Sequence, residues 1–156
     1  MPALFLLSII ASITFGQQYD HVIKTYENGQ KMFEGKFKNE KVDGPYRFWY
    51  ENGQMSFEEN YKDGIKIGIW TGWYQNGQKS IEFDSGSDGK SISWYQNGQK
   101  SSEHFYINGK VEGLEIYWYE SGQKYREVTY LDGELTAEKR WNEDGSVIKI
   151  EDFYLF

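Results

Sequence analysis

Apolar and polar residues alternate along most of the chain in short runs, and glycine-containing turn sequences separate these runs. The runs are rich in Tyr, Phe, Trp and Ile, which favour strands, and they lack the three-to-four-residue apolar spacing of a helix. We therefore expect an all-β fold, an elongated single-sheet antiparallel meander of about eleven strands. The clearest expected strands lie at residues 46–50, 56–61, 69–74, 115–119 and 125–130.

The turn sequences follow a motif, aromatic-x-Asn/Ser-Gly-Gln, that recurs every 21 to 24 residues. Full copies lie at residues 26–30, 50–54, 74–78, 95–99 and 119–123, and a decayed sixth copy lies at 141–145. Because Asn-Gly tolerates the positive φ angles of hairpin turns, each repeat is expected to be a β-hairpin unit. The predicted turn residues are Asn28, Gly29, Asn52, Gly53, Asn76, Gly77, Asn97, Gly98 and Gly122.

A second turn sequence divides each repeat, at residues 39–44, 63–68, 108–113 and 132–134. The third repeat is three residues shorter than its neighbours and has Ser-Gly-Ser-Asp-Gly at residues 85–89. This shortening predicts a tighter connection at the same place in the repeat.

Alignment of the repeats on the motif glycine produces two aromatic columns that are the candidate binding residues. Four residues before the glycine lies a Trp, or Thr25 in the first copy, and three residues before it lies a Tyr in every full copy. Neighbouring residues of a strand point to opposite faces, so both faces of the sheet should carry aromatic side chains. Exposed rows of this kind can bind sugars or a protein partner, and the alternative is that they only pack a thin sheet. The columns are Trp49, Trp73, Trp94 and Trp118, and Tyr50, Tyr74, Tyr95 and Tyr119.

Two turn geometries are compatible with the motif. A two-residue Asn-Gly turn would place each Trp opposite a small residue such as Ser56, Ser80 or Ser101. A type I turn followed by a bulge would place each Trp opposite a Lys column and allow cation–π contacts. The sequence leaves both open.

The sequence predicts no catalytic residue, metal site or cofactor. A Glu recurs five residues after each motif glycine, but a column in equivalent environments cannot easily supply the unequal acid and base that glycoside hydrolysis needs. The two histidines, His21 and His104, are interpreted as ordinary strand residues. The chain has no Cys, which excludes disulfides and thiolate metal sites. The net charge of −7 argues against nucleic acid or an anionic membrane as the main partner.

The first sixteen residues differ from the rest, because residues 4–15 are almost entirely apolar. This run is too short for a membrane-spanning helix and is typical of a signal-peptide core. We expect a signal peptide at 1–16, cleaved after Gly16, followed by a repeat domain at 17–156. Export would make the protein secreted, periplasmic or surface-located, without a stable membrane span after cleavage. The alternatives are an apolar N-terminal strand or helix that caps the array and a cytoplasmic location.

The motif, the Glu and aromatic that follow it, and the second Asp/Asn-Gly turn together resemble the MORN repeat variant over about 130 residues of the chain. Bacterial proteins built from this repeat are called YwqK-type antitoxins. The resemblance implies a sheet of β-hairpins without catalytic residues. Residues 69–74 also resemble choline-binding repeats of cell-wall proteins.

These observations favour a non-enzymatic, exported repeat protein that binds another protein or acts as a scaffold. Open edges at the ends of the array could also allow self-association by strand addition. Two alternatives are an antitoxin or immunity protein that neutralises a toxin, and a cell-surface module that binds carbohydrate or choline.

Overall fold

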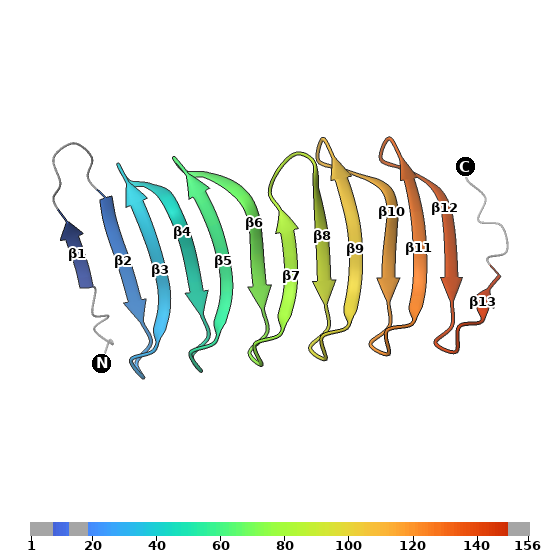
Figure 1. Ribbon diagram of the computed structural model, residues 1–156, viewed down its shortest axis with the longest axis horizontal. Helices are drawn as coiled ribbons and strands as arrows, with labels where there is room; N and C mark the ends of the chain where they lie inside the picture. Colours follow the sequence, from blue (N-terminus) through green and yellow to red (C-terminus); the bar gives the residue numbers. More distant parts are fainter. Residues whose placement is uncertain (1–7, 13–18, 150–156) are drawn as a thin grey trace, which may run out of the picture. The chain divides into compact units, whose positions relative to one another are not determined.

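The computed structural model describes residues 8–12 and 19–149, and every regular element in these residues is a β-strand (Figure 1). The first six strands are β1 (Ser8–Ser12), β2 (Tyr19–Thr25), β3 (Lys31–Lys38), β4 (Lys41–Trp49), β5 (Met55–Lys62) and β6 (Ile65–Trp73). The others are β7 (Lys79–Asp84), β8 (Gly89–Trp94), β9 (Lys100–Ile107), β10 (Lys110–Trp118), β11 (Lys124–Leu131), β12 (Glu134–Trp141) and β13 (Val147–Ile148).

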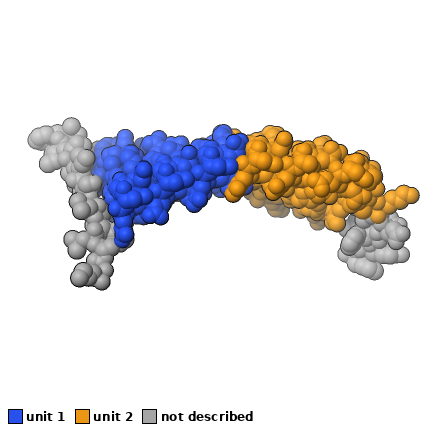
Figure 2. All heavy atoms as spheres, turned by 90° about the horizontal axis from the view of Figure 1, so that it is seen from below, with its two compact units in different colours: residues 1–79 blue, residues 80–156 orange. Residues whose placement is uncertain are grey.

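The chain divides into two compact units, residues 1–79 and residues 80–156 (Figure 2). In unit 1, strands β1 to β6 pair one after another in antiparallel fashion. In unit 2, strands β7 to β13 do the same. No crossover connection interrupts the chain order of the strands in either unit. The expected fold class, an all-β antiparallel meander of hairpin repeats, is therefore confirmed.

The motif turn is a type I turn followed by a glycine bulge, which decides between the two geometries left open by the sequence. In the first copy the amide of Gly29 donates to the carbonyl of Tyr26 (3.0 Å), and the amide of Tyr26 donates to the carbonyl of Gln30 (2.9 Å). Gly29 has a φ of 83°, which residues other than glycine rarely adopt. The bulge shifts the register, so that Trp94 lies opposite Lys100 and not opposite Ser101.

The strands end at the Trp of the motif, one residue earlier than expected, because the following Tyr is the first residue of the turn. The Tyr column therefore lies in the turns and not, as expected, in the strands.

The second turn of a full repeat is a two-residue turn with positive φ at both positions. Asn108 and Gly109, with φ angles of 51° and 74°, connect β9 to β10 in this way. This combination is typical of a type I′ turn, whose twist matches that of the paired strands. The register then shifts close to the second glycine, between Glu112 and Ile116.

The short third repeat lacks that register shift. Strands β7 and β8 have six residues each, against eight or nine in the strands of the full repeats on either side, and their pairing runs without a bulge. Four residues, 85–88, connect them, in place of the usual two. The prediction of a tighter connection is therefore wrong, because the missing residues come from the strands and from the bulge.

The expected signal segment is only partly covered by the described residues. Strand β1 pairs with β2 in unit 1, from Ser8 opposite Ile23 to Ser12 opposite Tyr19. The expected cleavage site after Gly16 lies outside the described residues, and export stays a prediction. With β1 and β13 included, the described residues hold thirteen strands, two more than the eleven that we expected.

Each unit has very little interior. Among the described residues only Phe33 in unit 1 and Val128 in unit 2 are buried hydrophobic residues, with 7% and 0% of their surface exposed. A single sheet layer without a second layer cannot bury more, so side-chain columns along its two faces must stabilise it.

Candidate functional site

The predicted Trp residues end strands β4, β6, β8 and β10, and all four are half-buried. Lysine ammonium groups lie over two of the indole rings. Lys31 lies 5.2 Å from the ring centre of Trp49, and Lys100 lies 5.7 Å from that of Trp118. Each lysine covers the Trp of the next repeat and not the residue opposite it in its own hairpin, which is Thr25 for Lys31 and Trp94 for Lys100. Cation–π contacts therefore form, but between repeats.

The Glu column lies on the same face as these Lys and Trp side chains, which we call the Trp face. In unit 1, Glu34 accepts hydrogen bonds from Lys31 (2.9 Å) and His21 (2.8 Å). The Lys31 hydrogen bond lowers the pKa of Glu34, although burial opposes this shift and His21 adds to the lowering.

The Glu column continues in unit 2 with the same kind of partners. Burial would raise the pKa of Glu103, but hydrogen bonds from Lys100 and Lys90 outweigh it and the pKa is lowered. Glu127 pairs with Lys124 in the same way. These glutamates all pair with lysines, so they form an ion-pair column along the Trp face.

The motif Tyr and Asn residues connect each turn to the next one. The Tyr50 hydroxyl donates to the carbonyl of Trp73 (2.8 Å), and the Tyr95 hydroxyl donates to that of Trp118 (2.7 Å). The Asn97 amide donates to the carbonyl of Glu120 (2.8 Å), while its oxygen accepts from the amide of Gln99 (2.9 Å). Equivalent bonds recur from Tyr26, Tyr119, Asn28 and Asn52. We call this repeated set of bonds the turn ladder.

Packing between neighbouring turns also explains why Gln follows Gly in every full motif. The side chain of Gln30 lies against Gly53, where a Cβ atom would come within 2.7 Å of the glutamine oxygen. Gln99 lies against Gly122 in the same way, at 3.0 Å. Each glycine therefore satisfies two requirements, a positive φ angle and room for the previous glutamine.

The opposite face, which we call the core face, carries a polar cluster in unit 2 that sequence reasoning missed. The Tyr117 hydroxyl donates to the buried carboxylate of Glu115 (2.8 Å). The Nδ1 atom of His104 lies 3.2 Å from the same carboxylate but makes no hydrogen bond within the described residues. Arg126 stacks 5.4 Å from the ring centre of Tyr117, and its Nε donates to Glu138 (2.7 Å).

Burial and the bond to Glu115 raise the pKa of Tyr117, in that order of importance, so this phenol stays protonated. The signal for the cluster was present in the sequence. His104 lies six residues after a motif glycine and Glu115 seven before the next, two positions that vary between repeats.

The same face of unit 1 is aromatic. Phe33 contacts Tyr46 edge-on at 4.8 Å and Phe48 at 5.1 Å between ring centres, and Phe57 contacts Trp70 at 5.2 Å. One buried carboxylate lies among the rings. Glu59 pairs with Lys66 and accepts a hydrogen bond from Tyr61. Burial and this bond raise the pKa of Tyr61 to about 12.

The described residues contain no group of three or more His, Cys, Asp and Glu side chains that could hold a metal ion. No helix in the described part of the chain is long and apolar enough to cross a membrane.

A comparison with protein-family models matches the MORN repeat variant at residues 42–63, 87–108 and 111–132. Each matched segment contains one motif turn with its glycine at 53, 98 or 122, together with the strands on both sides. A search of curated proteins finds no match. The resemblance seen in the sequence is therefore confirmed at three of the repeats, which match the MORN repeat variant.

Proposed function

We propose that this protein is a non-enzymatic, exported binding or scaffolding module whose partner is another protein. The observation that carries the proposal is that the repeated motif side chains make contacts inside the sheet, whereas other, apolar side chains are exposed. The Tyr and Asn of the motif, and the Glu column, are engaged in contacts inside the sheet. Large apolar side chains on both units are exposed instead, among them Ile65 and Ile69 in unit 1 and Ile107 and Leu131 in unit 2.

A binding surface of this kind fits a repeat protein better than a catalytic role does. Repeats present a wide surface from similar units, and exposed apolar side chains at intervals along that surface can be buried by a partner. The N-terminal apolar run supports export, which would place that partner outside the cytoplasm.

The lysines argue against choline or a sugar as the ligand of the Trp row. A quaternary ammonium group would need the ring faces of Trp49 and Trp118, over which Lys31 and Lys100 already lie. The antitoxin alternative has no residue of its own in its favour, and a secreted chain would not meet a cytoplasmic toxin.

The proposal is tested with the full chain expressed in its own host. Intact-mass analysis of the exported fraction should find the chain shortened by sixteen residues, and a chain that keeps Met1 and stays in the cytosol would contradict export. A partner captured by cross-linking should bind the purified protein directly in calorimetry. Titration with choline or oligosaccharides should leave Trp fluorescence unchanged, and saturable quenching by either would overturn the choice of a protein partner.

A further inference from the structure

Unit 2 carries the whole net charge of the chain. Unit 1 has nine acidic and nine basic residues, whereas unit 2 has fifteen acidic and eight basic residues. The difference equals the overall charge of −7. The two units are built from the same repeat, so their charged residues can be compared at equivalent positions.

One substitution separates an acid from its partner. In unit 1, Asp43 lies ten residues before a motif glycine and Lys62 lies nine residues after it, and their side chains pair at 3.1 Å. In unit 2 the same two positions hold Glu112 and Leu131. The acid is kept, but leucine replaces the lysine. Glu112 consequently makes no ion pair with any residue in the described part of unit 2.

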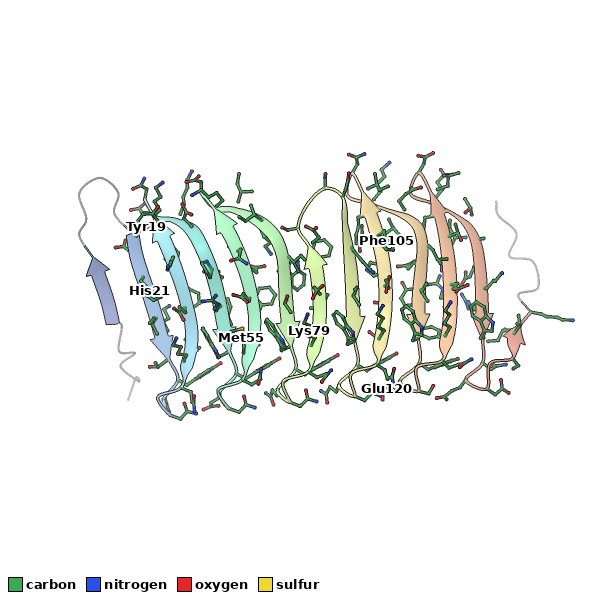
Figure 3. The ribbon with its side chains drawn as sticks, viewed as in Figure 1. Tyr19, His21, Met55, Lys79, Phe105 and Glu120 are labelled. Carbon is green, nitrogen blue, oxygen red and sulfur yellow. The ribbon has the colours of Figure 1, made fainter. Side chains whose placement is uncertain are left out.

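Apolar side chains surround the unpaired acid on the Trp face. Ile107, Leu114 and Leu131 are 50%, 42% and 61% exposed. Lys90 lies 5.1 Å from the ring centre of Phe105, labelled in Figure 3, so we exclude that ring from the patch. We call Ile107, Leu114 and Leu131, with Glu112 and Asp132, the unit 2 patch.

The patch borders a shallow hollow of about 330 Å³. Its lining residues are Ile107, Asn108, Lys110, Glu112 and Asp132. Lys110 is the one cation among them, and its side chain lies against the turn at Gly133, where a Cβ atom would approach it to 3.2 Å. Like Glu112, Asp132 forms no ion pair within the described residues. The hollow thus offers two free carboxylates beside exposed aliphatic side chains.

We propose that the unit 2 patch binds a cationic, amphipathic segment of a partner protein, in which Lys or Arg side chains alternate with aliphatic ones. The partner's cation takes the place at Glu112 that Lys62 takes at Asp43 in unit 1, and its aliphatic side chains cover Leu131 and Ile107. Complementary charge favours association with such a segment and disfavours binding of a second copy of this acidic unit. This inference rests on the proposed protein-binding function and names the surface and the chemistry of the partner.

The comparison with unit 1 suggests a variant that should block the patch. Leu131→Lys restores the arrangement of unit 1 and gives Glu112 an internal partner. Glu112→Gln removes the carboxylate and keeps the shape of the side chain. Ser121→Lys adds the same charge as Leu131→Lys at an exposed motif turn of unit 2, away from the patch.

The probe is a fluorescently labelled ten-residue peptide of alternating Lys and Leu, and its affinity for the full-length protein is measured by anisotropy. Leu131→Lys should weaken binding about tenfold and Glu112→Gln about threefold. Ser121→Lys should stay within about twofold of wild type, and added salt should weaken binding to wild type. A peptide with Glu in place of Lys should not bind, nor should one with Ser in place of Leu.

Circular dichroism establishes that each variant keeps its strands. Equal affinity for wild type and Leu131→Lys, or equal binding of the Glu peptide, would overturn the inference. A natural partner that binds the protein directly but equally well to Leu131→Lys would overturn this surface and leave the proposed function standing. Peptide binding that depends on the patch, without any natural protein partner, would support this surface and overturn the proposed function.

Discussion

The two units share a backbone and differ in what lies on it. Both use the turn ladder and the ion-pair column of the Trp face. On the core face, unit 1 packs aromatic rings around one buried carboxylate, whereas unit 2 carries a chain of polar contacts from His104 to Glu138. The backbone and its turns therefore define the repeat, and the faces are free to diverge.

The units should respond differently to loss of their buried hydrophobic residue, and this is the largest effect we expect. Phe33→Ala removes a ring that contacts Tyr46 and Phe48 and should destabilise unit 1 by about 3 kcal/mol or more. Val128→Ala removes two methyl groups from unit 2 and should cost about 2 kcal/mol.

Amide hydrogen exchange resolves the two units, because repeat arrays unfold locally and report stability residue by residue. Protection should fall mainly in β3 to β5 for Phe33→Ala and in β10 to β12 for Val128→Ala. A uniform loss over all strands in either variant would show that the units unfold together and would break the comparison.

The turn ladder should respond in the same way in both units. Asn52→Ala and Asn97→Ala each remove a bond to a carbonyl in the next turn and a bond from the glutamine amide of their own turn. Each should cost about 1 kcal/mol, since these bonds are solvent-exposed. Ser121→Asn should act in the opposite direction, because it completes the ladder at the one full motif that lacks Asn. Urea unfolding measures all three, and a large difference between the two Ala variants would mean that the units do not share one ladder.

The turns, the strand order and the repeat period could be predicted from the sequence, because they depend on local chemistry. Asn-Gly recurring every 24 residues restricts the backbone whatever its neighbours are. The register of Trp94 could not be decided, since a two-residue turn and a bulged turn are both compatible with the motif, and hydrogen bonds between turns favour the second. The absence of the bulge in the third repeat could not be predicted either, because a bulge depends on how neighbouring strands pair.

The faces were harder to predict than the backbone. A column such as the one containing Glu59 and His104 holds a different residue in each repeat, so it gives no periodic signal. The Trp and Tyr columns give a periodic signal in the sequence, and their repetition reflects contacts between neighbouring repeats. Residues that vary between equivalent positions, such as Lys62 and Leu131, are the basis of the proposed binding surface.

Acid should weaken ion pairs in both units, with a smaller effect than the changes above. Hydrogen bonds from Arg126 lower the pKa of Glu138 in unit 2, against the effect of burial, with Arg140 adding to the lowering. In unit 1, the hydrogen bond from Lys31 lowers the pKa of Glu34. A carboxyl group whose folded pKa is lowered stabilises the fold above its unfolded pKa, about 4.3, and this stabilisation is lost as pH falls through the folded pKa.

Glu138→Gln and Glu34→Gln should therefore destabilise their units by less than about 1 kcal/mol at pH 7 and have no effect near pH 2. Urea unfolding at a series of pH values provides the measurement. An equal loss at pH 2 and pH 7 would assign these residues a packing role and not a charged one.

The smallest expected effect concerns the second turns, where unit 1 holds a strained residue that unit 2 lacks. Glu40 has a φ of 63° at the position that Gly64, Gly109 and Gly133 occupy in other repeats. A non-glycine side chain in this conformation costs about 1 to 2 kcal/mol, and replacement by glycine removes that cost. Part of the resulting stabilisation is lost, because glycine also makes the unfolded chain more flexible. Glu40→Gly should therefore stabilise unit 1 by about 0.5 kcal/mol.

The reverse exchange, Gly133→Glu, should destabilise unit 2 by more, because a Cβ atom there also approaches the side chain of Lys110. Hydrogen exchange of the β3–β4 and β11–β12 hairpins measures both changes. If Glu40→Gly instead destabilises its hairpin, the glutamate makes a favourable contact that offsets its backbone strain, and the difference between the turns of the two units disappears.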